Sequence, residues 1–506
     1  MATITEGVPE DELVTPYSMH VSAKYLELTK KKLELTRLPR ELELPESRRW
    51  EQGTPKSVLE PLLDFWLEGY DWRAAETQFN LTLPQYRTTV DAPTSTNASN
   101  AQRLRIHFVH KRSKHDNAIP LLLCHTWPSS FVEVQRIIDA LIDPHSLPSF
   151  GSGAQQAFHV VAPSIPGFGF SDASLAEEFG LHGTAEVFNS LMSRLGYDKY
   201  VAHGTGWGFS ICRALALRHS TQCLAVHTAN PSFTEPTWKG NRVGYLKYRI
   251  AKLTQAKIPA LSFGYLPTEL QSQDGERTAD VLEHSLDLHN PKGATLHRLY
   301  SLRPQTLAYS LCDSPVGLLA ALLDVIYTRL PPQSPLISRS RSPFLSPVEL
   351  ELQGANQHDE ASSMRHSETS EAHENSSSLR QGELDTRSYA WSPTEILNFT
   401  MLQWLPGPEA ALRWLRRAHI DSMESAWRTY SAVPLGISTF YSRSNSTATP
   451  LMWGAASWDI AWVKRHQRPA TLPGIEAPDL LVLDLRECFG SLLSQGQLGN
   501  LPDATS

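Results

Sequence analysis

A glycine-rich run, YVAHGTGWG (200–208), is the segment whose residue types and spacing point most directly to chemistry. Glycines flank its central residue, Gly206, in the G-x-X-x-G form of a nucleophile elbow, a sharp strand-to-helix turn that exposes the central residue. The run follows an apolar strand and precedes a helical segment, FSICRALALRH (209–219). It lies downstream of HTWPSS (125–130), which has the position and shape of a loop whose backbone N–H groups stabilise an oxyanion. Together these features predict an active-site turn around Gly206.

Short apolar runs separated by helix-length stretches begin at Leu104 and predict the scaffold that positions this turn. LRIHFVH, IPLLLCH and FHVVAP are typical of a parallel sheet covered by helices, so we expect an α/β fold. Each run ends in a loop rich in Gly, Pro, Ser or Trp, and in doubly wound sheets such loops form the site. We also expect an amphipathic helix within 17–38, a strand over 433–441 and a helix over 477–493.

Length and composition exclude several classes of protein. With 506 residues, the chain is long enough for two units or one large domain with insertions. The 46 Lys+Arg and 53 Asp+Glu give a net charge of -7, which provides no electrostatic footprint for nucleic acid. The five cysteines show no CxxC pairing, which predicts reduced thiols and no zinc site.

The N-terminus MATITEGVPEDELV lacks the charged and apolar regions of a secretory signal. No stretch approaches the ~18 uninterrupted apolar residues that span a bilayer. We therefore expect a cytoplasmic protein without a transmembrane segment. The sequence leaves its oligomeric state open.

A Ser-rich insert over about 333–390 interrupts the ordered pattern. It contains no aromatic residue between Phe344 and Tyr389, too little apolar surface to offset the entropy of ordering. We expect disorder here. A tolerated loop or an unspliced coding segment is favoured over a phosphorylated regulatory insert.

Collinear segments over nearly the whole chain resemble a known family. They include LLDFWLEGYDWRAAETQFN (62–80), HTWPSSFVEVQRIIDAL (125–141), FHVVAPSIPGFGFS (158–171) and LMSRLGYDKYVAHGTGWG (191–208). In these segments the chain resembles the microsomal-type epoxide hydrolases, which combine an N-terminal helical region with an α/β-hydrolase fold.

The resemblance implies a domain organisation. It places the family's N-terminal region over 12–103 and the α/β-hydrolase core over 104–230 and 431–492. A mostly helical lid is expected over 231–430, interrupted by the Ser-rich insert.

The resemblance also implies where catalytic groups should lie. In such enzymes an Asp at the elbow attacks the epoxide to form an ester, a His with an acidic partner activates the water that hydrolyses it, and two lid Tyr hydroxyls bind the epoxide oxygen. Here the nucleophile position is Gly206, the acid position Arg443 and the base position Thr471. One lid Tyr position reads Leu296, and the other falls near 414–415. We therefore expect this chain to lack the two-step ester route.

The binding half of the site is expected to survive. The family's oxyanion donors map onto the backbone N–H groups of Trp127 and Trp207, whose rings could form apolar pocket walls or simply pack in the core. His203, beside the elbow, is a candidate pocket and proton-transfer residue, although a buried hydrogen-bonded histidine is the commoner case. His125 and Asp313 match family positions and are expected to be structural.

These observations predict an epoxide-hydrolase-like protein that binds a hydrophobic small molecule, epoxidised or not, in specialised metabolism or detoxification, with no cofactor and no metal. A non-catalytic pseudoenzyme and a ring-opening or cyclising isomerase remain alternatives. A non-functional relic is disfavoured because the core segments keep their apolar patterning. The deciding observation is whether His203, Tyr309 and Glu476 converge on Gly206.

Overall fold

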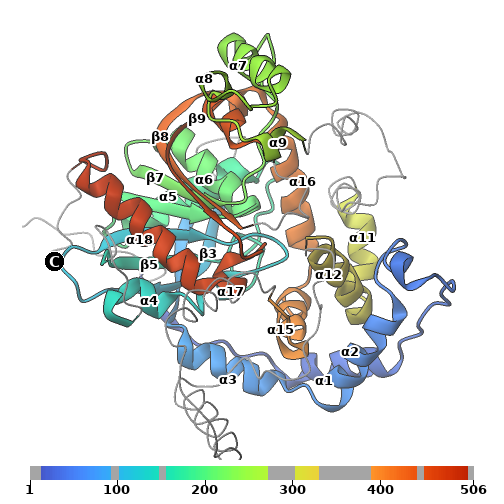
Figure 1. The fold of residues 1–506 in the computed structure, drawn as a ribbon. Coiled ribbons are helices and arrows are strands. Elements are labelled where there is room, and N and C mark those ends of the chain that lie inside the picture. Colours follow the sequence, from blue (N-terminus) through green and yellow to red (C-terminus); the bar gives the residue numbers. More distant parts are fainter. Residues whose placement is uncertain are drawn as a thin grey trace, which may run out of the picture.

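A nine-stranded mixed sheet organises the chain in the computed structural model, which describes residues 13–92, 102–146, 155–271, 303–329, 389–440 and 449–499 (Figure 1). The strand order is β1-β2-β3-β5-β4-β6-β7-β8-β9. The strands are β1 (Thr15–Tyr17), β2 (Gln85–Ala92), β3 (Gln102–Lys111), β4 (Ile119–Cys124), β5 (Phe158–Pro163), β6 (Tyr200–Gly204), β7 (Cys223–Ala229), β8 (Ser431–Phe440) and β9 (Trp458–His466).

Helices before and within the sheet region come first in the chain. They are α1 (Ala23–Glu34), α2 (Lys56–Glu68), α3 (Trp72–Thr82), α4 (Ile138–Ile142), α5 (Leu181–Arg194) and α6 (Trp207–Arg218), with the short 3-10 helix η3 (Phe131–Val134) after β4. The later helices are α7 (Arg242–Leu253), α8 (Pro259–Ser262), α9 (Pro267–Gln271), α11 (Pro304–Leu311), α12 (Pro315–Arg329), α15 (Pro393–Trp404), α16 (Glu409–Met423), α17 (Pro473–Glu476) and α18 (Pro478–Ser494).

The sheet confirms the predicted α/β class. The strands β5, β4, β6, β7, β8 and β9 pair in parallel, while β1, β2 and β3 add an antiparallel edge. Every residue of β4, β5 and β6 is buried, which explains why these strands read as continuous apolar runs. The carboxyl ends of the parallel strands share one edge of the sheet, so the loops after them can form a site.

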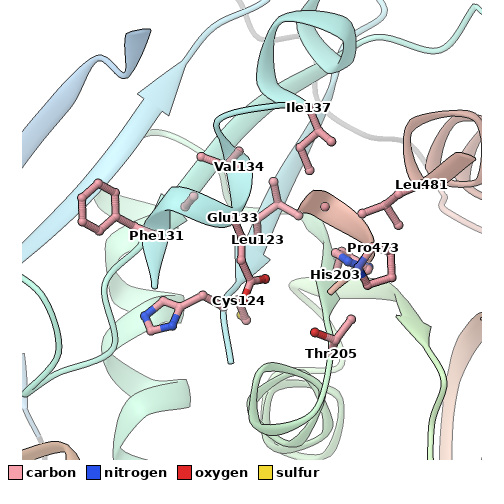
Figure 2. Close-up of a pocket in the computed structure, with 13 residues that line it drawn as sticks. Leu123, Cys124, Phe131, Glu133, Val134, Ile137, His203, Thr205, Pro473 and Leu481 are labelled. Carbon is pink, nitrogen blue, oxygen red and sulfur yellow. The ribbon is translucent and has the colours of Figure 1, made fainter. Parts of the chain in front are cut away.

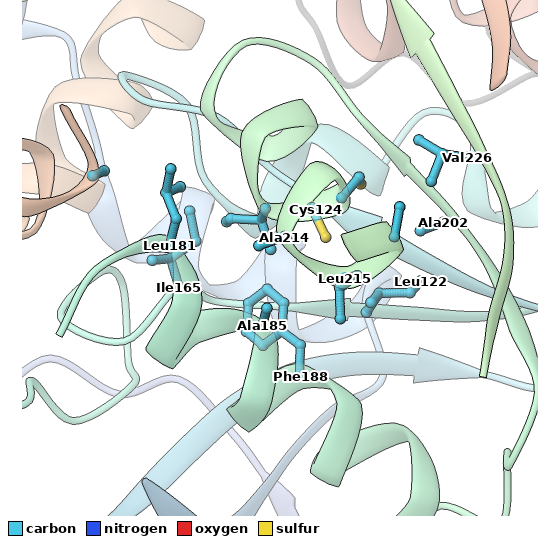
Figure 3. Close-up of a cluster of buried hydrophobic side chains, with 14 of the residues drawn as sticks. Leu122, Cys124, Ile165, Leu181, Ala185, Phe188, Ala202, Ala214, Leu215 and Val226 are labelled. Carbon is cyan, nitrogen blue, oxygen red and sulfur yellow. The ribbon is translucent and has the colours of Figure 1, made fainter. Parts of the chain in front are cut away.

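Helices bury both faces of the sheet. On one face, α5 and α6 contribute Ala185, Phe188 and Leu215 to a cluster that also holds Leu122 and Ala202 from the strands (Figure 3). On the other face, α4 and α18 pack with the N-terminal helices against a second apolar cluster. The predicted secondary structure is confirmed at α1, α6, β8 and α18, each within a few residues of the expected bounds.

The helices between β7 and β8 lie in the part of the chain expected to form the lid, and its limits at 231 and 430 remain a proposal. One of these helices, α15, contacts the N-terminal region through two hydrogen bonds. Trp404 Nε1 of α15 donates to Thr29 Oγ1 (2.8 Å), and Tyr70 OH donates to Asn398 Oδ1 (2.8 Å). At the other end, the carboxylate of Asp421 on α16 accepts the N–H of Leu181 (2.7 Å) at the start of α5.

Three predicted features lie outside the described residues: nearly all of the Ser-rich insert, the loop that holds Arg443, and Leu296 at one of the lid Tyr positions. Within the described ranges, no single helix is long and apolar enough to cross a membrane. The helices α11 and α12 pass such a test only together, and they are bent by 119° at the break between them.

Candidate active site

The turn between β6 and α6 has the geometry of a nucleophile elbow. Gly206 caps α6 with φ +50° and ψ -120°, a backbone conformation that glycine adopts far more readily than other residues. A Cβ on Gly204 would lie 2.4 Å from the carbonyl carbon of Gly208, and one on Gly208 would lie 2.0 Å from the oxygen of Cys124. The flanking glycines are therefore required by close backbone contacts, while Gly206 itself is exposed.

Thr126 occupies the space beside Gly206 where a side chain would begin. A Cβ on Gly206 would lie 2.7 Å from Thr126 Oγ1. The same hydroxyl oxygen accepts a hydrogen bond from the backbone N–H of Trp207 (3.0 Å), the group predicted as an oxyanion donor. This donor is therefore bonded to the protein's own side chain.

Sequence reasoning missed the contribution of Thr126. The signal was present, because the oxyanion loop reads HTWP where the family pattern is HGWP-like. The added side chain at 126 and the missing side chain at 206 lie next to each other in space, 80 positions apart in the chain. Only the fold relates the two substitutions.

The two tryptophans predicted as pocket walls differ in their surroundings. The ring of Trp127 is buried in the core, which agrees with the packing alternative. Trp207 is only partly buried, and its ring lies edge-on to Trp414, with 6.1 Å between centroids. Trp414, near which the second lid Tyr position was predicted, donates its Nε1–H to Thr184 Oγ1 of α5 (2.9 Å). An anchored indole therefore packs against the ring of Trp207, the first residue after Gly206.

His203 belongs to a chain of buried hydrogen bonds that runs across the sheet beneath α18. Its Nδ1 lies 3.0 Å from His227 Nδ1, and His227 Nε2 lies 3.0 Å from Ser438 Oγ. Ser438 Oγ donates to Asp484 Oδ2 (2.5 Å), which also accepts from His466 Nε2 (2.6 Å). Because the Ser438 proton goes to the carboxylate, His227 must donate from Nε2, and His203 must donate from Nδ1.

Burial keeps the two histidines at the inner end of this chain neutral. It lowers the pKa of His203 to about 4, and it lowers the pKa of His227 well below its usual value, with His203 and His466 adding to the effect. The charge of Asp484 is balanced by the ammonium of Lys464, 3.4 Å from Oδ1. At neutral pH His203 is therefore not a cationic acid, and its Nδ1 proton is directed away from the elbow.

A small cavity lies below the elbow (Figure 2). Its volume is about 20 Å³, room for one water-sized group and too little for an organic substrate. His203, Thr205 and Glu133 line it, together with Pro473 of α17. Residues that follow β9 therefore line the same cavity as residues of the β6–α6 turn.

His125 holds the oxyanion loop, in agreement with its predicted structural role. Its Nδ1 donates to the carbonyl of Thr126 (3.2 Å), and its Nε2 accepts the N–H of Ile165 (3.0 Å). Burial lowers its pKa to about 4, so the ring stays neutral while it bridges the two loops. Glu133 Oε1 accepts the N–H of Thr126 (3.2 Å) and fixes the loop from the other side.

Thr471, which the family resemblance predicts at the base position, lies in a loop organised by Glu476. One oxygen of this carboxylate accepts the N–H groups of Thr471 and Leu472, and the other accepts Trp391 Nε1–H (3.1 Å). Tyr309, on α11, is 74% exposed. His203, Tyr309 and Glu476 therefore do not converge on Gly206.

Two groups of side chains within the described ranges have the spacing of metal ligands. His182, Asp421 and Glu424 form one, but Arg417 Nη2 already lies 2.7 Å from Asp421 Oδ1 and supplies the positive charge. The other group, His115, Asp143 and His145, is largely exposed. We assign no metal to either.

Comparison with known proteins agrees with this fold. The family model described as "Epoxide hydrolase N terminus" matches residues 14–134, and the one described as "alpha/beta hydrolase fold" matches residues 119–273. The chain is 35% identical over 305 residues to a Stigmatella aurantiaca protein whose name assigns it to the epoxide hydrolases without establishing the activity, over 60% of this chain and 58% of that protein. It is 29% identical over 328 residues to juvenile hormone epoxide hydrolase 1 of Ctenocephalides felis, over 64% of this chain and 62% of the relative.

These alignments span about three-fifths of the length of the relatives. Solved structures extend the likeness of fold. An epoxide hydrolase of Aspergillus niger has a TM-score of 0.61 at 21% identity, covering 96% of this chain and 97% of its own. The juvenile hormone epoxide hydrolase of Bombyx mori has a TM-score of 0.62 at 19% identity, covering 96% and 95%. From the two family models and these relatives, the chain belongs to the microsomal-type epoxide hydrolase family.

Proposed function

We propose that this epoxide-hydrolase-like protein binds a hydrophobic small molecule, epoxidised or not, and does not hydrolyse it through an aspartyl ester. The positions Gly206 and Thr471 carry neither a nucleophile nor a base. Arg443 at the acid position completes the substitution of the three groups. Binding without covalent chemistry is the function that this set of residues supports best.

The observation that carries the proposal is the hydrogen bond from Trp207 N–H to Thr126 Oγ1. In the ester route, this N–H would stabilise negative charge that develops on the substrate, and such stabilisation requires a donor aimed at that charge. Here the donor is bonded to a neutral hydroxyl. Stabilisation of the substrate's negative charge by the Trp207 N–H is therefore weakened, in addition to the absence of a nucleophile at Gly206.

Aromatic side chains around the elbow support a hydrophobic ligand. Trp207 is partly exposed, and its ring packs edge-on against the buried ring of Trp414. Binding sites for small molecules are commonly lined by such rings. Two relatives are named for a juvenile hormone epoxide hydrolase activity, which supports an epoxide-bearing ligand or its diol.

We retain a cytoplasmic role in specialised metabolism or detoxification as part of the proposal. A ring-opening or cyclising isomerase is less well supported, because that chemistry needs a proton donor near the bound molecule. His203 is neutral and directed toward His227, and Tyr309 is largely exposed.

The test compares binding and turnover on the full chain. Purified protein is titrated with a panel of aryl and alkyl epoxides and their diols by calorimetry, and diol formation is followed separately by mass spectrometry. We expect saturable binding of some panel members and diol formation no faster than in buffer. Diol formation by the unmodified protein would overturn the proposal.

A pair of variants locates the binding. Trp207→Ala should weaken binding because it removes the exposed ring beside the elbow. Leu175→Gln, a change at an exposed position in a different loop, serves as the matched control and should bind as the unmodified chain does. Equal binding by both variants would place the ligand away from the elbow.

A further inference from the structure

The helix α7 presents an apolar stripe to solvent. Val243, Leu246, Ile250 and Leu253 follow the 3-4-3 spacing that places side chains on one face of a helix. All four are exposed, with Val243 63% and Leu253 87% accessible. The stripe therefore faces away from the protein core.

The opposite face of α7 is firmly packed. Tyr248 and Ala251 are buried, and the ring of Tyr248 lies edge-on to Trp453 with 5.5 Å between centroids. The helix thus has two apolar faces, of which the core uses one. Figure 1 shows α7 and α8 at one extremity of the molecule, far from the N-terminal helices α1 and α2.

The neighbouring segments extend this apolar surface. Trp238 precedes α7 and is half exposed, and Ile258 and Leu261, in and beside α8, are exposed as well. Monomeric soluble proteins rarely gather so many exposed apolar side chains on adjoining elements without a function. We call this set the α7 patch; it consists of Trp238, Val243, Leu246, Ile250, Leu253, Ile258 and Leu261.

Positive charge surrounds the patch. At 3.6 residues per turn, Arg242 and Arg249 fall on one flank of the stripe and Lys247 on the other. Between Pro236 and Thr268 the sequence contains no Asp or Glu, although the whole chain has a net charge of -7. The cations of this stretch are Lys239, Arg242, Lys247, Arg249, Lys252 and Lys257.

We propose that the α7 patch docks the protein on an anionic phospholipid bilayer, with the axis of α7 in the plane of the interface. An apolar face flanked by Lys and Arg is typical of helices that lie in a membrane interface. Trp238 beside the helix is a residue type enriched at that depth. Negative headgroups complement the six cations, and the acyl chains cover the stripe.

This docking is independent of the proposed ligand binding. It involves no membrane-spanning helix, and it uses residues outside the elbow. A bilayer contact would also place the protein where hydrophobic molecules concentrate. The two proposals can fail separately, because one is measured with vesicles and the other with soluble ligands.

The test is flotation of the full chain with vesicles of phosphatidylcholine, with or without phosphatidylserine. The unmodified protein should float with the phosphatidylserine vesicles and not with phosphatidylcholine alone, and added salt should release it. In K247Q/R249Q, each lost cation should lower the partition coefficient roughly five-fold. In L246Q/L253Q the coefficient should fall roughly ten-fold or more, because two apolar contacts with the acyl chains are lost.

The control matches these changes at exposed positions elsewhere, with Lys24→Gln on α1 and Leu175→Gln after β5. K24Q/L175Q should float like the unmodified chain, and circular dichroism verifies that every variant folds. Three results would overturn the proposal: no flotation with phosphatidylserine vesicles, equal flotation with phosphatidylcholine alone, or α7 variants that float as well as the control. Association through α7 with a second copy or with an acidic protein, without vesicle binding, would overturn it too.

Discussion

A carboxylate at the elbow is expected to need a second substitution, because the hydroxyl of Thr126 stands where the new side chain would begin. A Cβ on Gly206 would lie 2.7 Å from Thr126 Oγ1. G206D must therefore displace the hydroxyl and break its bond with Trp207 N–H, which costs about 0.5–1.5 kcal/mol. It also places a side chain at φ +50°, which costs about 1–3 kcal/mol. We expect G206D to lower the free energy of unfolding by about 3 kcal/mol.

Removing the hydroxyl should recover part of that loss. In G206D/T126G the backbone strain remains, but the steric conflict is gone. Urea unfolding of the unmodified chain, both single variants and the double variant forms a double-mutant cycle, and we expect a favourable coupling of about 1–2 kcal/mol. T126S keeps the hydroxyl, so G206D/T126S should resemble G206D alone. Additivity within about 0.5 kcal/mol would refute the contact between Thr126 and position 206.

The same variants report on chemistry. With an aryl epoxide in excess, the carboxylate of G206D/T126G can attack a ring carbon, break its C–O bond and form an ester, while the alkoxide takes a proton from water. Thr471 at the base position cannot activate water, so the ester should accumulate. Intact-protein mass spectrometry should detect one adduct of the epoxide's mass in G206D/T126G, less in G206D and none in the unmodified chain. Equal labelling of G206D and G206D/T126G would show that Thr126 does not block the site.

Three further predictions concern the buried polar groups. Burial lowers the pKa of His203 from 6.5 to about 4, so as pH falls the unfolded chain takes up a proton at this residue before the folded chain does. The free energy of unfolding should therefore be at its full value above about pH 6.5 and decline toward pH 4. Urea unfolding at several pH values measures this loss, about 3 kcal/mol for the group. His203→Asn should reduce the decline by that amount, while the other buried histidines with lowered pKa values, such as His125 and His227, still contribute. Ser438→Ala should cost about 1–3 kcal/mol, because it leaves the His227 N–H without an acceptor and removes one of the donors to the Asp484 carboxylate, which keeps His466 and Lys464. Glu476→Gln should cost about 1–3 kcal/mol in the same assay. Both carboxylate oxygens of Glu476 accept hydrogen bonds, one from Trp391 and the other from the Thr471 loop, and the amide of Gln has only one oxygen that can accept.

Each of these has a contradicting outcome. If His203→Asn leaves the pH profile of the unfolding free energy unchanged, the pKa of His203 does not differ between the folded and the unfolded chain. A loss below about 0.5 kcal/mol in Ser438→Ala would show that the hydrogen-bonded chain is not a structural element. Thr254→Ala, at the C-terminal end of α7, is the control for Ser438→Ala. Its hydroxyl donates to the backbone carbonyls of Ile250 and Ala251 and, unlike Ser438, accepts from no buried side chain, so its loss should be small.

Much of the fold was predictable because its signals are local. The strands β4, β5 and β6 are buried on both faces, so they read as continuous apolar runs, and helix-length stretches separate them. The glycines at 204 and 208 marked the elbow because backbone atoms leave no room for a Cβ there. The family resemblance predicts the nucleophile position at Gly206 and the base position at Thr471, and neither residue type can perform that role.

The remaining features depend on partners distant in the chain. The hydrogen-bonded chain from His203 to Asp484 joins residues on β6, β7, β8 and α18, and no sequence pattern indicates that these side chains meet. The same holds for Glu476, whose carboxylate holds the Thr471 loop and Trp391 rather than facing the elbow. The spacing of the apolar residues in α7 is visible in the sequence. Which of the two apolar faces of the helix is covered depends on the packing of Tyr248 against Trp453.

The sequence by itself determined the α/β scaffold and the place of the elbow, because buried strands and tight glycine turns are properties of short segments, and it predicts that the elbow lacks a nucleophile. Only the tertiary structure decided which side chain lies beside Gly206. Thr126 and Gly206 lie on loops that follow two neighbouring strands, and the parallel pairing of β4 with β6 brings the hydroxyl of one against the open position of the other. Hydrogen bonds and steric contacts act over a few ångströms in space, whatever the distance along the chain.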